Sequence, residues 1–255
     1  MENFKKTRSN EIFDTSNAEN QRNDRLKELH LGLMPEFGES WNGHSLVTLN
    51  RQSLSRILYY DHLYKQLLGV PGVICEFGVQ WGATLSLLSS LRGTYEPYNH
   101  SRKIIGFDTF EGFVNVDHNI DGEHVNDGDY HVQTNYEETL DEILSLQEAN
   151  CPIPHIKKFE LVKGDASKSV IQWLEQNPQT IIGMAIFDMD IYKPTRDVLE
   201  AIIPYLTKGS VLVFDELNCA AFPGETQAVR EVLGLNNIKL QHFAHQPMCA
   251  WAIFE

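Results

Sequence analysis

The sequence predicts an α/β protein: a doubly wound, mostly parallel sheet with helices on both faces and a reversed last strand. From residue 72 onward, apolar runs of strand length alternate with stretches that have helical periodicity. Acidic residues follow four of these strands, and open α/β sheets bind their ligands at the carboxyl ends of the strands. The final segment, IKLQHFAHQPMCAWAIF, has the pattern of an antiparallel pair.

Length, charge and cysteine usage narrow the possible functions. The 255 residues are 42% hydrophobic, which suits one α/β domain with an N-terminal extension. The net charge of -14 argues against nucleic acid and anionic membranes as partners. The four cysteines form no C-x-x-C motif, the first 24 residues have no apolar signal-peptide core, and no apolar run is long enough to span a membrane. We therefore expect a cytoplasmic protein with reduced cysteines.

Three parts are expected along the chain. Residues 1–24 are polar and predict a flexible segment, residues 25–70 predict a helical lid, and residues 71–255 predict the main domain. The lid carries the stretch LMPEFGESWNGHSLVTL, rich in Gly, Pro and aromatic residues, and then a helix at 50–68 that packs on the core.

The elements of the main domain follow from the apolar periodicity. Strands are expected at 73–76, 103–107, 159–163, 181–187 and 210–214, helices at 83–91, 136–149, 167–176, 194–206 and 224–233, and a closing hairpin at 237–243 and 248–254.

The first strand ends in an acidic glycine turn, VICEFGVQWG. Glu76 stands at the strand end, Gly78 lets the backbone approach a ligand, and Gly82 lets the next helix begin close by. This predicts a site for a nucleotide-like ligand, although the spacing is neither G-x-G-x-x-G nor a P-loop, so a pyrophosphate cradle is not supported. The alternative is a strand-turn-helix whose glycines are only structural.

Two further acids follow strands. Asp108, in KIIGFDTFEGF, is suited to accept hydrogen bonds from the hydroxyls of a ribose. Asp165, in VKGDASKSV, opens a helix. It can face an adenine amino group, or it can simply cap that helix.

The most specific cluster combines two neighbouring strand ends. IFDMDIYKPT places Asp188 and Asp190 after one buried strand, and VLVFDELN places Asp215 and Glu216 after the next. Carboxylates that converge in this way repel one another unless a cation or a proton lies between them. Oxygen ligands without Cys or His favour Mg²⁺, Mn²⁺ or Ca²⁺. One carboxylate of the set can remove a proton from a substrate hydroxyl.

The motifs EFGVQWGATLSLL, GFDTFEGF, FDMDIYKPT and VFDELN…FPGETQAV together resemble the macrocin O-methyltransferase family, in matching order over residues 40 to 255. The resemblance implies the class I methyltransferase fold and S-adenosylmethionine as cofactor, with Mg²⁺ or Mn²⁺. The implied reaction is methylation of a hydroxyl on a small molecule or glycan, most often a sugar of a natural product. We also expect a homo-oligomer.

The resemblance also implies roles for single residues. Asp190 is the base, and the metal ligands are Asp188, Asp215 and Glu216. The family usually has Asp-Asp-Tyr where this chain has Asp-Glu-Leu. The implied cofactor-binding residues are Glu76, Phe77, Gly78, Gly82, Thr84, Asp108, Thr109, Phe110, Gly164, Asp165, Ala166 and Asp188.

Alternatives remain at this point. A more distant resemblance to cephalosporin-hydroxylase-like proteins allows hydroxylation, and a cofactor-binding protein without catalysis is possible, although mere binding does not need the four clustered acids. The segment 114–134, VNVDHNIDGEHVNDGDYHVQT, is either a binding lid or a solvated acidic insertion. Its histidines at 118, 124 and 131 do not have the spacing of a standard metal site.

Overall fold

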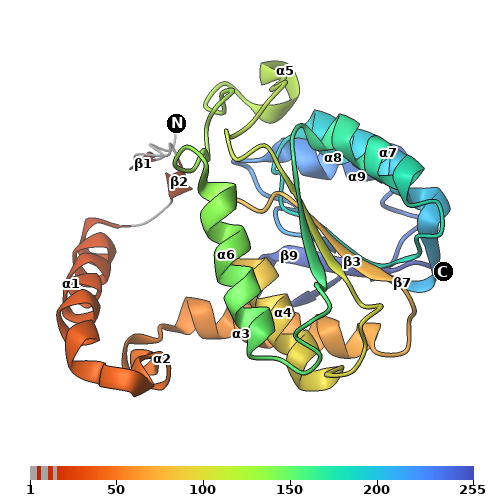
Figure 1. Cartoon of the computed structure of the whole chain (residues 1–255). Coiled ribbons are helices and arrows are strands. Elements are labelled where there is room, and N and C mark those ends of the chain that lie inside the picture. Colours follow the sequence, from red (N-terminus) through yellow and green to blue (C-terminus); the bar gives the residue numbers. More distant parts are fainter. Residues whose placement is uncertain (1–4, 7–10, 14–15) are drawn as a thin grey trace. The chain divides into compact units, whose positions relative to one another are not determined.

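The computed structural model describes residues 5–6, 11–13 and 16–255, which divide into two compact units, Met1–Leu58 and Tyr59–Glu255 (Figure 1). The flexible segment expected at 1–24 therefore lies partly outside the described residues. The boundary between the units falls within helix α3 (Arg51–Leu67). The three-part division expected from the sequence stays a prediction, and each unit is described by itself.

The first unit consists of short local elements. They are β1 (Lys5–Lys6), β2 (Ile12–Phe13), α1 (Asn17–Leu33), η1 (Met34–Ser40), α2 (Trp41–His44), η2 (Ser45–Thr48) and the start of α3. Ser16 begins α1, because its hydroxyl accepts a hydrogen bond from the backbone N–H of Glu19 at 3.2 Å. The α1 helix is then tied to η2 by a 2.6 Å contact between His30 Nδ1 and the Thr48 hydroxyl.

The second unit contains a seven-stranded sheet in the order β5-β4-β3-β6-β7-β9-β8. The strands are β3 (Val73–Phe77), β4 (Ile104–Asp108), β5 (Phe159–Lys163), β6 (Ile182–Phe187), β7 (Leu206–Phe214), β8 (Gln241–Phe243) and β9 (Gln246–Ile253). The strands β3 to β7 pair in parallel, and β9 is antiparallel to both β7 and β8. The predicted doubly wound sheet with a reversed end strand is thus confirmed.

Helices cover both faces of this sheet (Figure 1). The end of α3, α4 (Ala83–Tyr95) and α6 (Tyr136–Ala149) form one hydrophobic core with the sheet. On the opposite face lie α7 (Ala166–Gln176), α8 (Tyr192–Ile202) and α9 (Pro223–Val232), and a short turn η3 (Ile203–Tyr205) leads from α8 into β7. Each face therefore has its own core, as expected for alternating strands and helices.

A row of aromatic rings aligns the ends of four central strands. Phe77 stacks on Phe107 with ring centroids 4.9 Å apart and on Phe187 at 5.5 Å. Phe187 in turn stacks on Phe214 at 5.3 Å. All four side chains are buried and pair in register across the sheet. Because the strands end level, the residues that follow these rings emerge together at one edge of the sheet.

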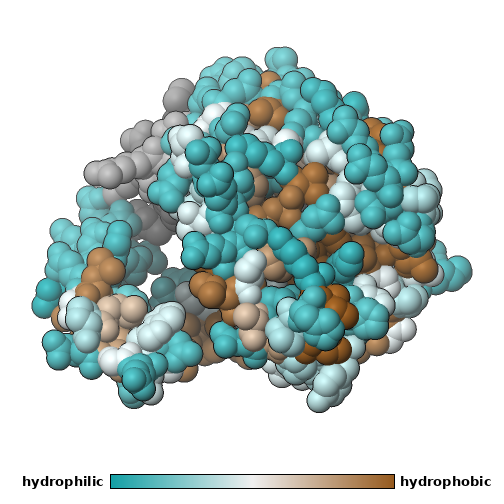
Figure 2. Space-filling view, viewed as in Figure 1, coloured by the Kyte–Doolittle hydropathy of each residue, from teal (hydrophilic) through white to brown (hydrophobic). Residues whose placement is uncertain are grey.

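Hydrophilic residues make up most of the side of the molecule that Figure 2 shows, and apolar residues are visible near its middle. Within the described residues, no helix combines the length and the apolar character needed to cross a bilayer.

Candidate active site

The turns after β3 and β6 meet at the point where the order of the strands reverses. This is the usual ligand site of an open α/β sheet. A Cβ atom on Gly78 would lie 1.8 Å from the carbonyl oxygen of Asp188, and Gly78 has φ +91°. Only glycine fits here, because a side chain would collide with this carbonyl, and the left-handed backbone would add strain. The glycine turn after β3 is therefore in contact with the Asp188 turn after β6.

Three non-glycine residues at this edge also have left-handed backbone conformations. They are Gln80 with φ 47°, Phe110 with φ 57° and Asp190 with φ 62°, in the turns after β3, β4 and β6. Such conformations are uncommon for residues with side chains, and they concentrate at functional sites. Their presence in three adjacent turns marks this edge as the candidate site.

Asp108 holds the glycine turn in place. Its Oδ2 accepts hydrogen bonds from the backbone N–H groups of Val79 at 2.6 Å and Gln80 at 2.8 Å, and its Oδ1 accepts one from Phe110. Burial raises the pKa of this carboxyl, although the three N–H donors act in the opposite direction. The expected contact with a ribose stays a prediction, whereas the structural role in the turn is visible. The hydroxyl of Thr109 donates to the carbonyl of Gly112 at 2.7 Å.

Other residues expected at the cofactor site are buried or lie in close packing contacts. A Cβ on Gly82 would lie 2.4 Å from Leu140 Cδ1, so this glycine allows α6 to pack against the start of α4. Thr84, in the first turn of α4, is buried. Glu76 at the end of β3 is also buried, with 1% exposure.

The turn after β5 lies beside Asp108. The backbone N–H of Gly164 donates to the carbonyl of Asp108 at 2.8 Å. Asp165 caps α7, because its Oδ1 accepts from the N–H of Ser167 at 3.0 Å, and Ala166 is buried. Of the two roles that the sequence left open for Asp165, the cap is observed, and the contact with adenine stays a prediction.

The two acidic pairs lie on adjacent strand ends, as expected. Asp188 follows β6 and Asp215 follows β7. The backbone N–H of Asp215 donates to the carbonyl of Phe187 at 3.1 Å. The thiol of Cys249 on β9 donates to Asp215 Oδ1 at 3.2 Å. Asp190 is buried, with 7% exposure.

Glu225, which the sequence analysis missed, joins these acids from α9. Its side chain is fully buried and its Oε1 accepts from the backbone N–H of Glu216 at 3.2 Å, while its Oε2 has no hydrogen-bond partner. Burial and the nearby charges of Asp190 and Asp215 raise the pKa of Glu225 well above its usual value. An acid in the first turn of a helix is common on any surface, so the sequence carried no signal for its burial.

The donor set fits a hard divalent cation. Among the residues described, no three His, Cys, Asp or Glu side chains are already arranged as a metal site. The acids at this edge nevertheless supply only oxygen, the donor that Mg²⁺ and Mn²⁺ prefer. The buried, unpartnered oxygen of Glu225 is the kind of atom that a cation would satisfy.

The segment 114–134 is docked on the second unit's own helices and contains the short helix α5 (His118–Asp121). Asp121 is buried, and its Oδ1 accepts from the N–H of Tyr192 at 2.7 Å, so it caps α8. His124 Nε2 lies 2.7 Å from the carbonyl oxygen of Ala221. The sequence predicted no regular structure here, because these anchoring contacts are made with residues far along the chain.

Replacing Gly224 should loosen this docking. A Cβ at Gly224 would lie 2.0 Å from Asp121 Oδ1 and 2.5 Å from the N–H nitrogen of Tyr192. We expect Gly224→Ala to lower the free energy of unfolding by about 1–3 kcal/mol, as overpacking does in other proteins. Urea denaturation measures this. Gly69→Ala is the matched control, since nothing lies within 4 Å of a Cβ there. Equal midpoints for the two variants would contradict the prediction.

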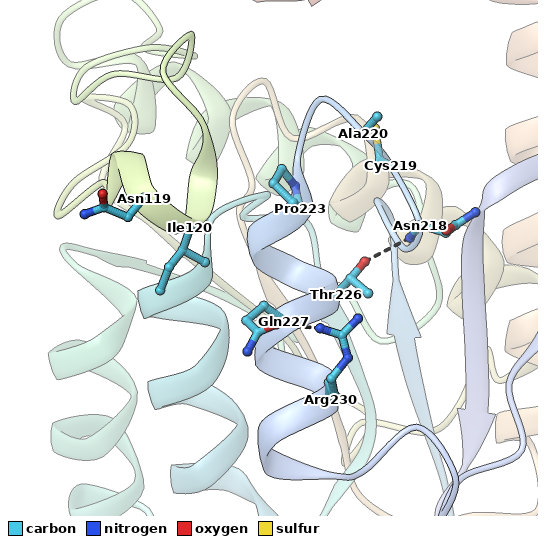
Figure 3. A pocket seen from close by; sticks show the side chains of 9 residues that line it. All are labelled: Asn119, Ile120, Asn218, Cys219, Ala220, Pro223, Thr226, Gln227 and Arg230. Atoms are coloured by element: carbon cyan, nitrogen blue, oxygen red, sulfur yellow. Dashed lines mark hydrogen bonds between the residues drawn. The ribbon is translucent and has the colours of Figure 1, made fainter.

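A cavity of about 430 Å³ lies on the outer side of α9. Figure 3 shows its lining, which consists of Asn119, Ile120, Asn218, Cys219, Ala220, Pro223, Thr226, Gln227 and Arg230. The Thr226 hydroxyl accepts from the N–H of Asn218 at 2.9 Å, and Arg230 Nη1 donates to Gln227 Oε1 at 2.6 Å. Glu225 lies on the buried face of the same helix. The α9 residues that line the cavity and Glu225 are therefore on opposite faces of this helix, whereas Cys219 in the lining interacts with Glu216.

Comparison with known proteins adds to this geometry. The chain is similar to the crystal structure of CalS11, the calicheamicin methyltransferase, with 40% identity over 95% of both chains and a TM-score of 0.90. It is also similar to apo CalS11, described as TDP-rhamnose 3'-O-methyltransferase, with 39% identity over 95% of this chain and 96% of that one and a TM-score of 0.84. The O-methyltransferase NovP shares the fold, at 17% identity over 78% of this chain and 79% of that one and a TM-score of 0.62. No family model and no curated protein sequence matches this chain.

Proposed function

This chain belongs to the family of sugar O-methyltransferases that includes CalS11, and on that premise we propose that its acceptor is a nucleotide-linked sugar. When bound, S-adenosylmethionine would supply the methyl group, and Mg²⁺ or Mn²⁺ would supply positive charge beside the acceptor. The similarity to CalS11 supports this acceptor, and the meeting of the glycine turn and the acidic strand ends at one edge of the sheet supports methyl transfer there.

The chain's own residues have separate tasks in this reaction. Gly78 and Asp108 shape the turn against which the cofactor lies. Asp188, Asp215 and Glu216 would hold the cation. Asp190, whose left-handed backbone turns it away from the strand direction, takes the proton of the attacking hydroxyl.

The acceptor is tested by mass spectrometry. The protein is incubated with S-adenosylmethionine, Mg²⁺ and either TDP-rhamnose or free rhamnose, and each product is examined for one added methyl group. We expect methylation of the nucleotide-linked sugar, the substrate named for CalS11. Methylation of free rhamnose alone would refute the nucleotide-linked acceptor and leave sugar O-methylation intact.

The metal requirement gives a second test. Because the proposed ligands are all carboxylates, EDTA should abolish methyl transfer, Mg²⁺ or Mn²⁺ should restore it, and Zn²⁺ should serve poorly. Glu216→Asp, which brings in the family's usual residue, should retain much of the activity. Full activity after exhaustive chelation would mean that Asp188, Asp215 and Glu216 are structural acids.

Methyl transfer is favoured over the other functions that the sequence left open. The similarity to CalS11 extends over nearly the whole chain, and the four acids that a non-catalytic subunit would not need follow the adjacent strands β6 and β7. Homo-oligomer formation and a cytoplasmic location remain predictions. Size-exclusion chromatography with light scattering tests the first.

A further inference from the structure

Glu225 stands apart from the other acids because it comes from a helix and not from a strand end. It lies in the first turn of α9, two residues after Pro223. An acid there ordinarily faces solvent or the N-terminal N–H groups of its own helix. This side chain instead reaches back to the N–H of Glu216, nine residues earlier, and is fully buried.

The environment of Glu225 is unfavourable without a further partner. Its Oε2 makes no hydrogen bond, and the carboxylates of Asp190, Asp215 and Glu216 are near enough to repel its charge. A buried polar atom without a partner costs free energy, and a buried charge among like charges costs more. A cation at this edge would relieve both costs.

Building on the proposed function, we propose that Glu225 belongs to the divalent-cation site. One carboxylate oxygen accepts from the backbone N–H of Glu216, and the other, which has no hydrogen-bond partner, would be available to the cation. The chain thus has a buried carboxylate on α9 in addition to the three strand-end ligands. It also links the start of α9 to the metal, so that cation binding tightens this helix against β7.

Cation affinity, and not activity, is the direct test. Glu225→Gln keeps the shape and an oxygen that can accept from the N–H of Glu216, but it removes the charge. Titration with Mn²⁺, followed by the electron paramagnetic resonance signal of the free ion, should show affinity weakened by at least about 10-fold, because even the loss of a group that only supports a metal ligand costs about 10–100-fold. Mg²⁺ should also raise the melting temperature of the wild type more than that of the variant, because binding to the folded state stabilises it.

Two controls separate this role from a structural one. Glu231→Gln changes an exposed acid on the same helix, whose Oε2 accepts from the Tyr192 hydroxyl, and it should leave Mn²⁺ affinity unchanged. Calorimetric titration with S-adenosylhomocysteine reports whether Glu225→Gln is folded. Should that variant fail to fold, Glu225→Asp, which keeps the charge but withdraws the oxygen, should weaken Mn²⁺ binding in the same direction.

Wild-type Mn²⁺ affinity in a folded Glu225→Gln protein would overturn the inference and leave the proposed function standing. Absence of any Mn²⁺ binding by the wild type would instead overturn the metal-dependent part of the proposed function. The two failures are therefore distinguishable.

Discussion

Asp190→Asn should lower turnover by roughly 10²–10⁴-fold, because it removes the carboxylate that we propose as the base for the acceptor hydroxyl. The amide has nearly the same shape as the carboxylate, and the side chain is already buried, so the fold should persist. Affinity for S-adenosylhomocysteine and for Mg²⁺ should stay close to that of the wild type. Steady-state kinetics with saturating Mg²⁺, together with calorimetric titrations, measure all three quantities.

Asp188→Asn is the matched comparison, since both acids lie in the same turn after β6. If Asp188 is a metal ligand, this variant should lose affinity for Mg²⁺ first, and an excess of Mg²⁺ should partly restore its turnover. The two roles rest on family resemblance, because the D-x-D spacing is symmetric. Rescue of Asp190→Asn by Mg²⁺, without rescue of Asp188→Asn, would require the roles to be exchanged.

The fold was predictable because its signals are local. Each buried strand is a short apolar run, such as Val73 to Cys75, and each is followed by a turn and a helical stretch. The strand ends were predictable for the same reason, since parallel strands place their carboxyl ends at one edge. The left-handed backbone of Asp190 and the stacked row of Phe rings were not, because both depend on contacts between strands.

The burial of charged side chains whose partners are distant in sequence could not be predicted either. Arg92 is the clearest case: a fully buried guanidinium that donates to both oxygens of Glu148 and to the carbonyl of Lys158. Charged residues on helices are usually solvated, and only the packed structure shows such a pair to be internal. Glu225 escaped notice for the same reason.

Asp108→Asn should destabilise the protein and weaken cofactor binding together. The carboxylate accepts from the N–H groups of Val79, Gln80 and Phe110, using both of its oxygens. An amide has one oxygen only, so in either orientation its NH₂ group faces at least one backbone N–H and a hydrogen bond is lost. A hydrogen bond to a charged group contributes about 1.5–3 kcal/mol, so the free energy of unfolding should fall by at least that amount.

Stability and cofactor binding should change together because Asp108 holds the turn after β3. Val79 and Gln80 directly follow Gly78, so releasing them changes the surface that meets the Asp188 turn. Urea denaturation and calorimetric titration with S-adenosylhomocysteine measure the two effects on the same sample. Asp165→Asn is the control, because Asn caps a helix as well as Asp does and stability should hardly change. Weaker cofactor binding with unchanged stability would assign Asp108 to the ribose alone, and lower stability with unchanged binding would assign it to the turn alone.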